Sequence, residues 1–211
     1  MYKMDPHVKH ILFVDGLVGA GKSTFIKKCK VKYPNLRIVL EPTNKWVESG
    51  MLTKFYSNKE KYSCEWQKYV MTTFLEELEE SLDQGDQFIL VERGHLAAYT
   101  VFSYILWRDG NMTDREYDEI RLLHEKYDRD LRLRGYVCDH IFLDTNVKTS
   151  MERLYARNHE NEKIGVTTEY QKRLLKRFYD LNLTPYSENE LWELIDSTMQ
   201  RLNEKMKLKD L

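Results

Sequence analysis

The segment from Gly16 to Ser23, Gly-Leu-Val-Gly-Ala-Gly-Lys-Ser, has the residue types and spacing of a loop that binds phosphate. It matches G-x-x-x-x-G-K-[ST] at every fixed position. Glycines in this pattern let several backbone N–H groups face one anion, and the following helix adds its positive end. Lys22 would reach the β- and γ-phosphates of a nucleotide, and the Ser23 hydroxyl would bind Mg²⁺. The phosphate-binding residues predicted here are Gly16, Gly19, Ala20, Gly21, Lys22, Ser23 and Thr24.

Four short apolar runs, 11–15, 37–41, 88–92 and 141–144, each end in an acidic residue. The four acids are Asp15, Glu41, Glu92 and Asp144. In open parallel sheets, ligands bind beyond the carboxyl ends of the strands, which is where these acids would lie. For Asp144 we favour a simple role as a cap of the following turn, and for Asp15 both interpretations stay open.

Two of these acids are candidates for phosphoryl transfer. Glu41 precedes Pro42, which stiffens the exit from the strand, and its carboxylate could accept the proton of an attacking hydroxyl. Glu92 could hold Mg²⁺ directly or through water, and Arg93 could spread the charge of the transition state. A salt bridge at a strand end is the alternative for this pair. We favour the catalytic interpretation because the phosphate loop is predicted on the same sheet edge.

An aromatic wall and one amide could bind an acceptor molecule. Trp46 could cover a base or a sugar, although it could equally be a packing aromatic. Gln67, Val70 and Phe74 share one helix face, from which the amide could pair with the edge of a nucleobase. Taken alone, Gln67 would more often be a core residue whose hydrogen bonds are satisfied.

Arg153 and Arg157 are four residues apart on a predicted helix and precede the polar segment 158–163. Two cations on one helix face that lead into a polar loop are typical of a lid over transferring phosphates, here at about 153–166. A solvated helix face is the alternative, and it is weakened by the other charged residues predicted at the site.

The elements that must position these residues alternate along the chain. The four apolar runs are continuous, as expected for parallel strands covered on both faces. Helices are predicted over 21–32, 63–82, 113–131, 146–157, 167–180 and 188–206, and Thr113-Asp-Arg-Glu116 resembles a capping box. We therefore expect one α/β domain over 1–211, a P-loop kinase-type doubly wound parallel sheet with four or five strands, flanked by helices and carrying a short lid.

The composition excludes several classes of protein. The 211 residues carry 33 Lys and Arg against 34 Asp and Glu, so a polybasic nucleic-acid arm or an acidic tail is not expected. No apolar run approaches the roughly 20 residues that span a bilayer, and no signal peptide is evident. Cys29, Cys64 and Cys138 stand far apart, which suggests a reduced protein without structural zinc. The expected location is the cytoplasm, of the host cell if the source is a virus.

Five motifs together resemble those of the cellular and viral deoxynucleoside kinases, the group of the deoxycytidine, deoxyguanosine and mitochondrial thymidine kinases. They are the phosphate loop, E-P-x-x-x-W from Glu41, W-Q-x-Y from Trp66, E-R-G from Glu92 and R-x-x-x-R from Arg153. The matches run from about residue 11 to residue 170. The resemblance implies transfer of a phosphoryl group from ATP or another NTP to the 5′-hydroxyl of a deoxynucleoside, with Mg²⁺, in nucleotide salvage.

The resemblance also implies roles for individual residues. Glu41 matches the general base, Arg93 the arginine beside it and Glu92 the acid associated with Mg²⁺. Tyr56 matches a contact of the sugar 3′-hydroxyl, and Gln67 matches the amide that reads the base. The residues that the resemblance places around the nucleoside are Glu41, Trp46, Leu52, Phe55, Tyr56, Trp66, Gln67, Val70, Phe74, Arg93, Ala98, Phe102 and Glu162.

Lid and oligomer expectations come from the same resemblance. Arg153 and Arg157 match lid arginines on the phosphates, and Glu162 matches a lid acid that contacts the sugar, with Glu160 as the alternative if the register shifts. The resemblance implies a homodimer. Apolar stripes over 113–131 and 191–206 would then be one core face and one oligomer face.

The base pocket indicates a branch of the family. Trp66 and Phe102 match the aromatic pair that sandwiches the base. Members that read cytosine or purines carry an Arg–Asp pair at the positions of Phe74 and Ala98. An apolar pair cannot hydrogen-bond a purine ring or an exocyclic amine, so the pocket resembles the pyrimidine-preferring, thymidine-tolerant branch. Two further departures are Gly94, where serine is usual, and the stretch 181–194, which shows no apolar run for a last strand.

Two other functions remain as alternatives. A thymidylate kinase or other nucleoside-monophosphate kinase would need a cationic site for the acceptor phosphate, and the acceptor face offers no cation. A nucleotide-binding regulatory protein without turnover belongs to a different class, and the intact Glu41, Arg93 and lid arginines argue against it.

Overall fold

The computed structural model describes residues 5, 8–82, 86–157 and 165–209. Its centre is a sheet of five strands in the order β2-β3-β1-β4-β5, in which every neighbouring pair is parallel. The expected doubly wound α/β architecture is confirmed. The strands are β1 (Lys9–Gly16), β2 (Arg37–Val39), β3 (Phe88–Glu92), β4 (Tyr136–Leu143) and β5 (Thr184–Tyr186).

The fifth strand exists although the stretch around it lacks an apolar run. β5 has three residues and pairs only with β4, with Pro185 opposite Phe142. Proline lacks a backbone N–H, and an edge strand tolerates it because one side of the strand needs no hydrogen bonds. Only Tyr186 of β5 is buried, so hydrophobic periodicity could not reveal the strand.

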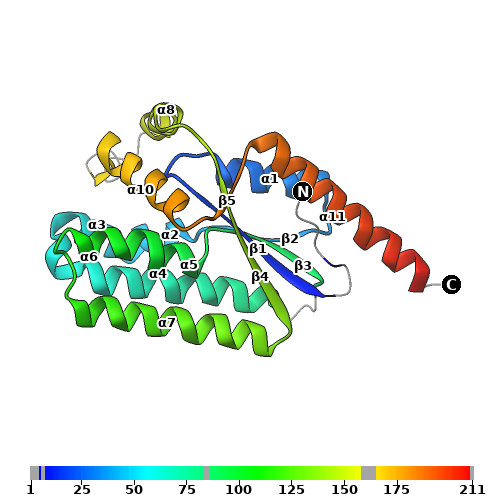
Figure 1. The fold of residues 1–211 in the computed structure, drawn as a ribbon, viewed down its shortest axis with the longest axis horizontal. Helices are drawn as coiled ribbons and strands as arrows, with labels where there is room; N and C mark the ends of the chain where they lie inside the picture. Colours follow the sequence, from blue (N-terminus) through cyan, green and yellow to red (C-terminus); the bar gives the residue numbers. More distant parts are fainter. Residues whose placement is uncertain (1–4, 6–7, 83–85, 158–164, 210–211) are drawn as a thin grey trace.

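Helices cover both faces of the sheet, with α1 and α11 on one side and α4, α5 and α7 on the other (Figure 1). Alternating residues of β1 serve the two sides: Leu12 and Val14 belong to one apolar cluster, and Ile11 and Phe13 to another. The helices are α1 (Lys22–Lys32), α2 (Thr43–Glu48), α3 (Met51–Ser57), α4 (Lys59–Leu82), α5 (His95–Ala97), α6 (Tyr104–Arg108), α7 (Asp114–Leu133), α8 (Val147–Arg157), α10 (Thr168–Asp180) and α11 (Glu188–Lys209), with a π-helix η1 (Ala98–Ser103) between α5 and α6.

The helices predicted from the sequence all occur, with small changes at their ends. α4 starts at Lys59, four residues before the predicted start. The capping box of α7 is present: the Thr113 hydroxyl accepts the backbone N–H of Glu116, and the Glu116 carboxylate accepts the backbone N–H of Thr113. The short helices α2, α3, α5 and α6 and the π-helix were not predicted, because segments of three to seven residues hold too few turns to show a period.

Both apolar helix stripes contribute residues to the interior of this chain. Leu191 and Ile195 of α11 are fully buried, and Ile120 and Leu131 of α7 are buried as well. Tyr117, His124, Tyr127 and Leu202 of the same stripes are only half-buried, so the expectation that one stripe forms an oligomer face stays a prediction. The large apolar side chains that α7 does expose are Leu122 and Leu133, which lie off the stripe.

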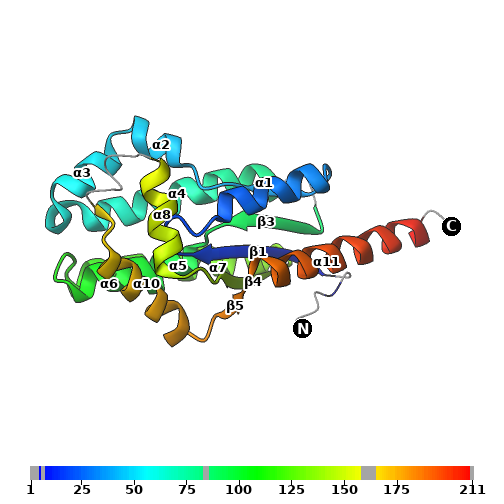
Figure 2. The ribbon, with the colours of Figure 1, turned by 90° about the horizontal axis from the view of Figure 1, so that it is seen from above.

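α11 is the second-longest described helix, and it extends past the sheet toward the C-terminus (Figure 2). Neither α11 nor any other helix of the described residues combines the length and the apolar character that crossing a membrane requires.

Candidate active site

The phosphate loop joins β1 to α1 and curls tightly. Gly19 and Gly21 have φ angles of +82° and +104°, in the left-handed region that favours glycine. A Cβ at Gly19 would lie 2.5 Å from the backbone oxygen of Ser150, at the start of α8. Glycine is therefore required there both for the turn and for the close approach of α8.

Lys22 folds back into this loop. Its side chain is buried, and Nζ donates to the backbone oxygen of Leu17 over 3.1 Å. Burial lowers the pKa of Lys22 to about 8, and the nearby Arg93 adds to the effect. The loop thus surrounds a cation that an incoming phosphate could pair with.

Ser23 and Glu92 meet across the gap between α1 and β3. The Ser23 hydroxyl donates to Glu92 Oε1 over 2.6 Å, and Glu92 is 3% exposed. A hydroxyl and a carboxylate are hard oxygen donors, which Mg²⁺ prefers. The donor set therefore fits the metal predicted for these two residues.

Arg93 and Glu41 form an ion pair beside the loop. Arg93 Nε donates to Glu41 Oε1 over 2.7 Å, and the guanidinium also reaches the backbone oxygen of Gly16 at 3.4 Å. Arg93 has a φ of +63°, which is strained for a residue other than glycine. The next residue, Gly94, packs closely against Phe13: a Cβ at this position would lie 2.9 Å from the Phe13 ring. The serine that is usual in the family would therefore fit only if that ring moved.

Asp15 supports this strained turn. Its side chain is fully buried, and Oδ1 accepts the backbone N–H of Gly94 over 3.3 Å. Oδ2 has no hydrogen-bond partner among the described residues. Burial raises the pKa of Asp15 to about 7, against the opposing effect of Arg93. Asp15 therefore ties the end of β1 to the turn after β3 and does not simply cap its own turn.

A cavity of about 390 Å³ opens next to the Arg93–Glu41 pair. Its wall is mainly apolar and aromatic, and it comes from α2, α3, α4, η1 and the segment leading into α10. The lining residues are Val18, Glu41, Thr43, Asn44, Trp46, Val47, Leu52, Phe55, Tyr56, Trp66, Gln67, Val70, Arg93, Ala98, Phe102, Arg157, Val166 and Tyr170.

Gln67 places a buried amide at this cavity. It is 4% exposed, and its Oε1 has no hydrogen-bond partner among the described residues. A buried polar atom without a partner is costly, so a ligand that donates to it would gain affinity. The neighbouring Trp66 stacks on Phe55 with ring centroids 5.5 Å apart, and Phe102 lies under the Arg93 guanidinium at 4.4 Å.

Trp46 lies at the cavity itself, whereas Phe74 packs behind Trp46. Trp46 lines the cavity and also donates from Nε1 to the hydroxyl of Thr73 over 2.8 Å. Phe74 is buried edge-to-face against Trp46 and does not belong to the lining. Phe74 thus lies behind Trp46, whereas Ala98 lies in the wall itself, and a role of Phe74 at the nucleoside pocket stays a prediction.

The two arginines of α8, Arg153 and Arg157, lie at the phosphate loop and at the cavity, respectively. Arg153 Nη1 donates to the backbone oxygen of Ala20 and lies against Gly21, in the phosphate loop. Arg157 lines the cavity, and contact of the two arginines with the phosphates of a nucleotide stays a prediction. Glu160 and Glu162 lie outside the described residues.

Gly165 brings the end of the predicted lid against the cavity. A Cβ at this position would lie 1.7 Å from the ring of Tyr56, so the ring occupies the space of a side chain. Val166 and Tyr170, which follow, also line the cavity.

Gln171 is a site residue that the sequence did not single out. It is fully buried, and its amide donates to the backbone oxygen of Val18 over 2.6 Å while accepting from the backbone N–H of Val18 over 3.3 Å. It therefore ties α10 to the phosphate loop. Its position on the same helix face as the buried Leu174 and Phe178 was the available signal.

The family model and the relatives found by comparison with known proteins point to the same family. A model of the deoxynucleoside kinase family matches residues 12–207. Protein 029R of Invertebrate iridescent virus 3 is 25% identical over 92% of this chain and 95% of its own length. The deoxyadenosine kinase of Dictyostelium discoideum and the human mitochondrial thymidine kinase 2 are each 28% identical, over 79% and 77% of this chain. The chain spans 64% and 60% of the length of these two relatives.

The buried Asp15 predicts how stability depends on pH. Between its ordinary pKa of 3.8 and about 7, folded Asp15 keeps a proton that the unfolded chain has released. Its contribution to stability is therefore complete below pH 3.8 and is lost as the pH rises toward 7. Asp15→Asn mimics the protonated acid and keeps an acceptor for Gly94. We expect the variant to gain stability relative to the wild type across this window, by up to about 1.4 kcal/mol per pH unit.

Urea unfolding of both proteins at a series of pH values measures this difference. A difference that stays constant with pH, or that favours the wild type as the pH rises, would contradict the assignment of a buried, protonated Asp15.

Proposed function

Because the chain belongs to the deoxynucleoside kinase family, we propose that it transfers the γ-phosphoryl group of ATP, or of another NTP, to the 5′-hydroxyl of a deoxynucleoside. The observation that carries this proposal is the position of the Arg93–Glu41 pair. Arg93 touches the phosphate loop at Gly16, and Glu41 lines the cavity that contains the Gln67 amide. One pair of side chains thus borders both the donor site and the acceptor site.

Glu41 is the proposed general base. The 5′-oxygen of the nucleoside forms a bond to the γ-phosphorus, the bond from that phosphorus to the leaving diphosphate breaks, and the hydroxyl proton moves to the Glu41 carboxylate. Arg93 holds this carboxylate in place over 2.7 Å. Lys22, Arg93 and Arg153 lie at the phosphate loop, where their charge would favour the transition state.

Ser23 and Glu92 are the proposed Mg²⁺ residues. The metal, when bound, neutralises charge that develops on the phosphate oxygens. Glu92 Oε2 also accepts the backbone N–H of Glu41 over 3.4 Å, so the metal carboxylate and the base are coupled through one hydrogen bond.

The proposed acceptor is a pyrimidine deoxynucleoside, with thymidine and deoxycytidine as candidates, and the proposed role is nucleotide salvage. Ala98 contributes only a methyl group to the cavity wall, and Phe74 lies behind Trp46. No acid among the described lining residues other than Glu41 could pair with an exocyclic amine. Gln67 remains as the amide that would bond the base edge.

A nucleoside-monophosphate kinase is the nearest rival. It needs a free cation for the acceptor phosphate. Arg93 is already paired with Glu41, and Arg157 is the other cation among the described lining residues. The base-side wall, with Tyr56, Trp66 and Val70, is uncharged, which favours a neutral acceptor.

We also propose that the enzyme acts as a homodimer in the cytoplasm. The family resemblance supports the dimer.

Glu41→Gln should lower kcat by a factor of about 10² to 10⁴, since the amide cannot accept the proton. The amide oxygen can still accept from Arg93, so the fold and the nucleoside KM should change little. Turnover is measured with thymidine and deoxycytidine, and Glu48→Gln, an exposed acid on α2, is the matched control. Near-normal turnover in Glu41→Gln would rule out this base.

Gln67→Leu should lower kcat/KM for deoxynucleosides at least about tenfold, because the leucine cannot bond the base edge. ATP affinity should stay unchanged. The assay compares the four common deoxynucleosides with thymidine monophosphate, and we expect pyrimidine nucleosides to be preferred. Gln200→Leu, on the exposed face of α11, is the control. An unchanged kcat/KM in Gln67→Leu, or a preference for the monophosphate, would count against the acceptor assignment.

A further inference from the structure

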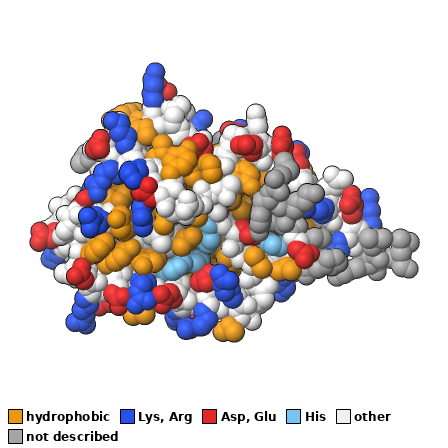
Figure 3. All heavy atoms as spheres, viewed as in Figure 1, with side chains coloured by type: hydrophobic (Ala, Val, Ile, Leu, Met, Phe, Trp, Pro, Cys, Tyr) orange, Lys and Arg blue, Asp and Glu red, His pale blue; other side chains and the backbone are white. Residues whose placement is uncertain are grey.

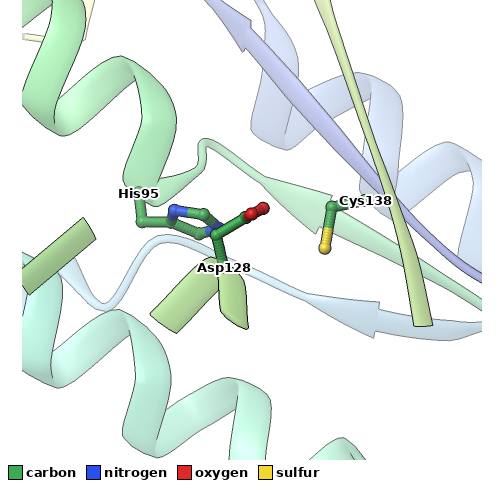
Figure 4. A group of neighbouring side chains, drawn as sticks. All are labelled: His95, Asp128 and Cys138. Atoms are coloured by element: carbon green, nitrogen blue, oxygen red, sulfur yellow. The ribbon is translucent and has the colours of Figure 1, made fainter. Parts of the chain in front are cut away.

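A second cluster of ligand-forming side chains lies outside the proposed active site, where α5, α7 and β4 meet. It consists of His95, Asp128 and Cys138, which come from three elements far apart in the sequence (Figure 4). One donor atom of each residue lies within 4.8 Å of the other two. Figure 4 shows the Asp128 carboxylate between the His95 ring and the Cys138 sulfur in that view. None of the three lines the nucleoside cavity.

His95 supplies an unsatisfied nitrogen. The residue is 3% exposed, and its Nε2 has no hydrogen-bond partner among the described residues. Its other ring nitrogen, Nδ1, lies 2.7 Å from Nδ1 of His124. An imidazole that donates from Nδ1 to His124 keeps the Nε2 lone pair free for a metal, and metal-bound histidines are commonly oriented by such a hydrogen bond.

Asp128 and Cys138 add an oxygen and a sulfur donor. Arg132 donates to Asp128 Oδ2 over 2.7 Å, which orients the carboxylate and leaves its other oxygen to act as a ligand. Cys138 is a half-buried thiol that forms no disulfide. Nitrogen, oxygen and sulfur donors from one His, one Asp and one Cys match the ligand preferences of Zn²⁺.

A third histidine, His140, borders the cluster. The ring centroids of His140 and His95 are 5.5 Å apart, and His140 Nδ1 also has no partner among the described residues. Histidine side chains reach the surface over α5, beside α7 (Figure 3). His140 is not one of the three residues whose donor atoms lie together, so a water molecule would complete a tetrahedral set.

We propose that His95, Asp128 and Cys138 bind one Zn²⁺-class transition-metal ion, separate from the Mg²⁺ proposed at Ser23 and Glu92. On binding, a bond forms between the metal and the Cys138 sulfur, and the thiol proton passes to solvent. The wide spacing of the cysteines led us to expect no structural zinc, but this cluster uses one cysteine with donors from other elements. His95 stands two residues after Arg93, so the ion would anchor the far side of the strained turn.

Co²⁺ titration of the full chain, without an affinity tag and with excess Mg²⁺ to occupy the phosphate site, tests the proposal. We expect one equivalent of Co²⁺ to bind, with a thiolate-to-metal charge-transfer band in the near ultraviolet, and Zn²⁺ to displace it. Cys138→Ala should abolish the band and weaken binding at least about tenfold. Cys29→Ala, which removes a buried thiol on α1, should leave both unchanged.

His95→Gln provides a second variant, checked for folding by circular dichroism and for nucleotide binding. It should weaken Co²⁺ binding at least about tenfold and shift the visible absorption bands. Co²⁺ binding without the charge-transfer band, or a band that persists in Cys138→Ala, would overturn the proposal. So would equal Co²⁺ affinity in the wild type and in folded His95→Gln.

Discussion

The rest of the site depends on one buried guanidinium, that of Arg93, which is 5% exposed. A buried charge is costly unless oppositely charged groups surround it. Burial by itself lowers the pKa of Arg93, but the neighbouring acids, Glu41 above all, outweigh it, and the net shift is upward. Because acidic residues must surround the Arg93 guanidinium, the ends of β1 and β3 and the segment after β2 lie close together. The positive φ of Arg93 is the backbone strain that accompanies this position.

The same arrangement explains why phosphate binding and acceptor binding adjoin. The guanidinium contacts Gly16 of the phosphate loop on one side and Glu41 of the cavity on the other. α8 and α10 then close over the loop, through Arg153 on Ala20 and Gln171 on Val18. A net charge of −1 over the whole chain thus conceals a local sorting of cations toward the loop and of acids toward the strand ends.

Local patterns in the sequence predicted much of this fold. The glycine loop, the continuous strands and the capping box at Thr113 depend on residues near one another in the chain. Their residue patterns therefore suffice to predict them from the sequence. Contacts between distant segments could not be read in this way. The displacement of Phe74 behind Trp46, the position of Arg157 on the cavity and the His95 cluster all depend on packing between elements. The place of β5 could not be read from the sequence because three residues with one buried side chain carry no period.

The central claim is that the phosphate loop and the apolar cavity serve a single transfer reaction across the Arg93–Glu41 pair. The most direct measurement is the affinity for a bisubstrate compound in which the 5′-oxygen of thymidine is joined through a phosphate chain to adenosine. The account predicts a Kd at least about 10² lower than that for ATP, because one molecule would occupy both sites. Binding no tighter than that of ATP, or unaffected by competing thymidine, would contradict it.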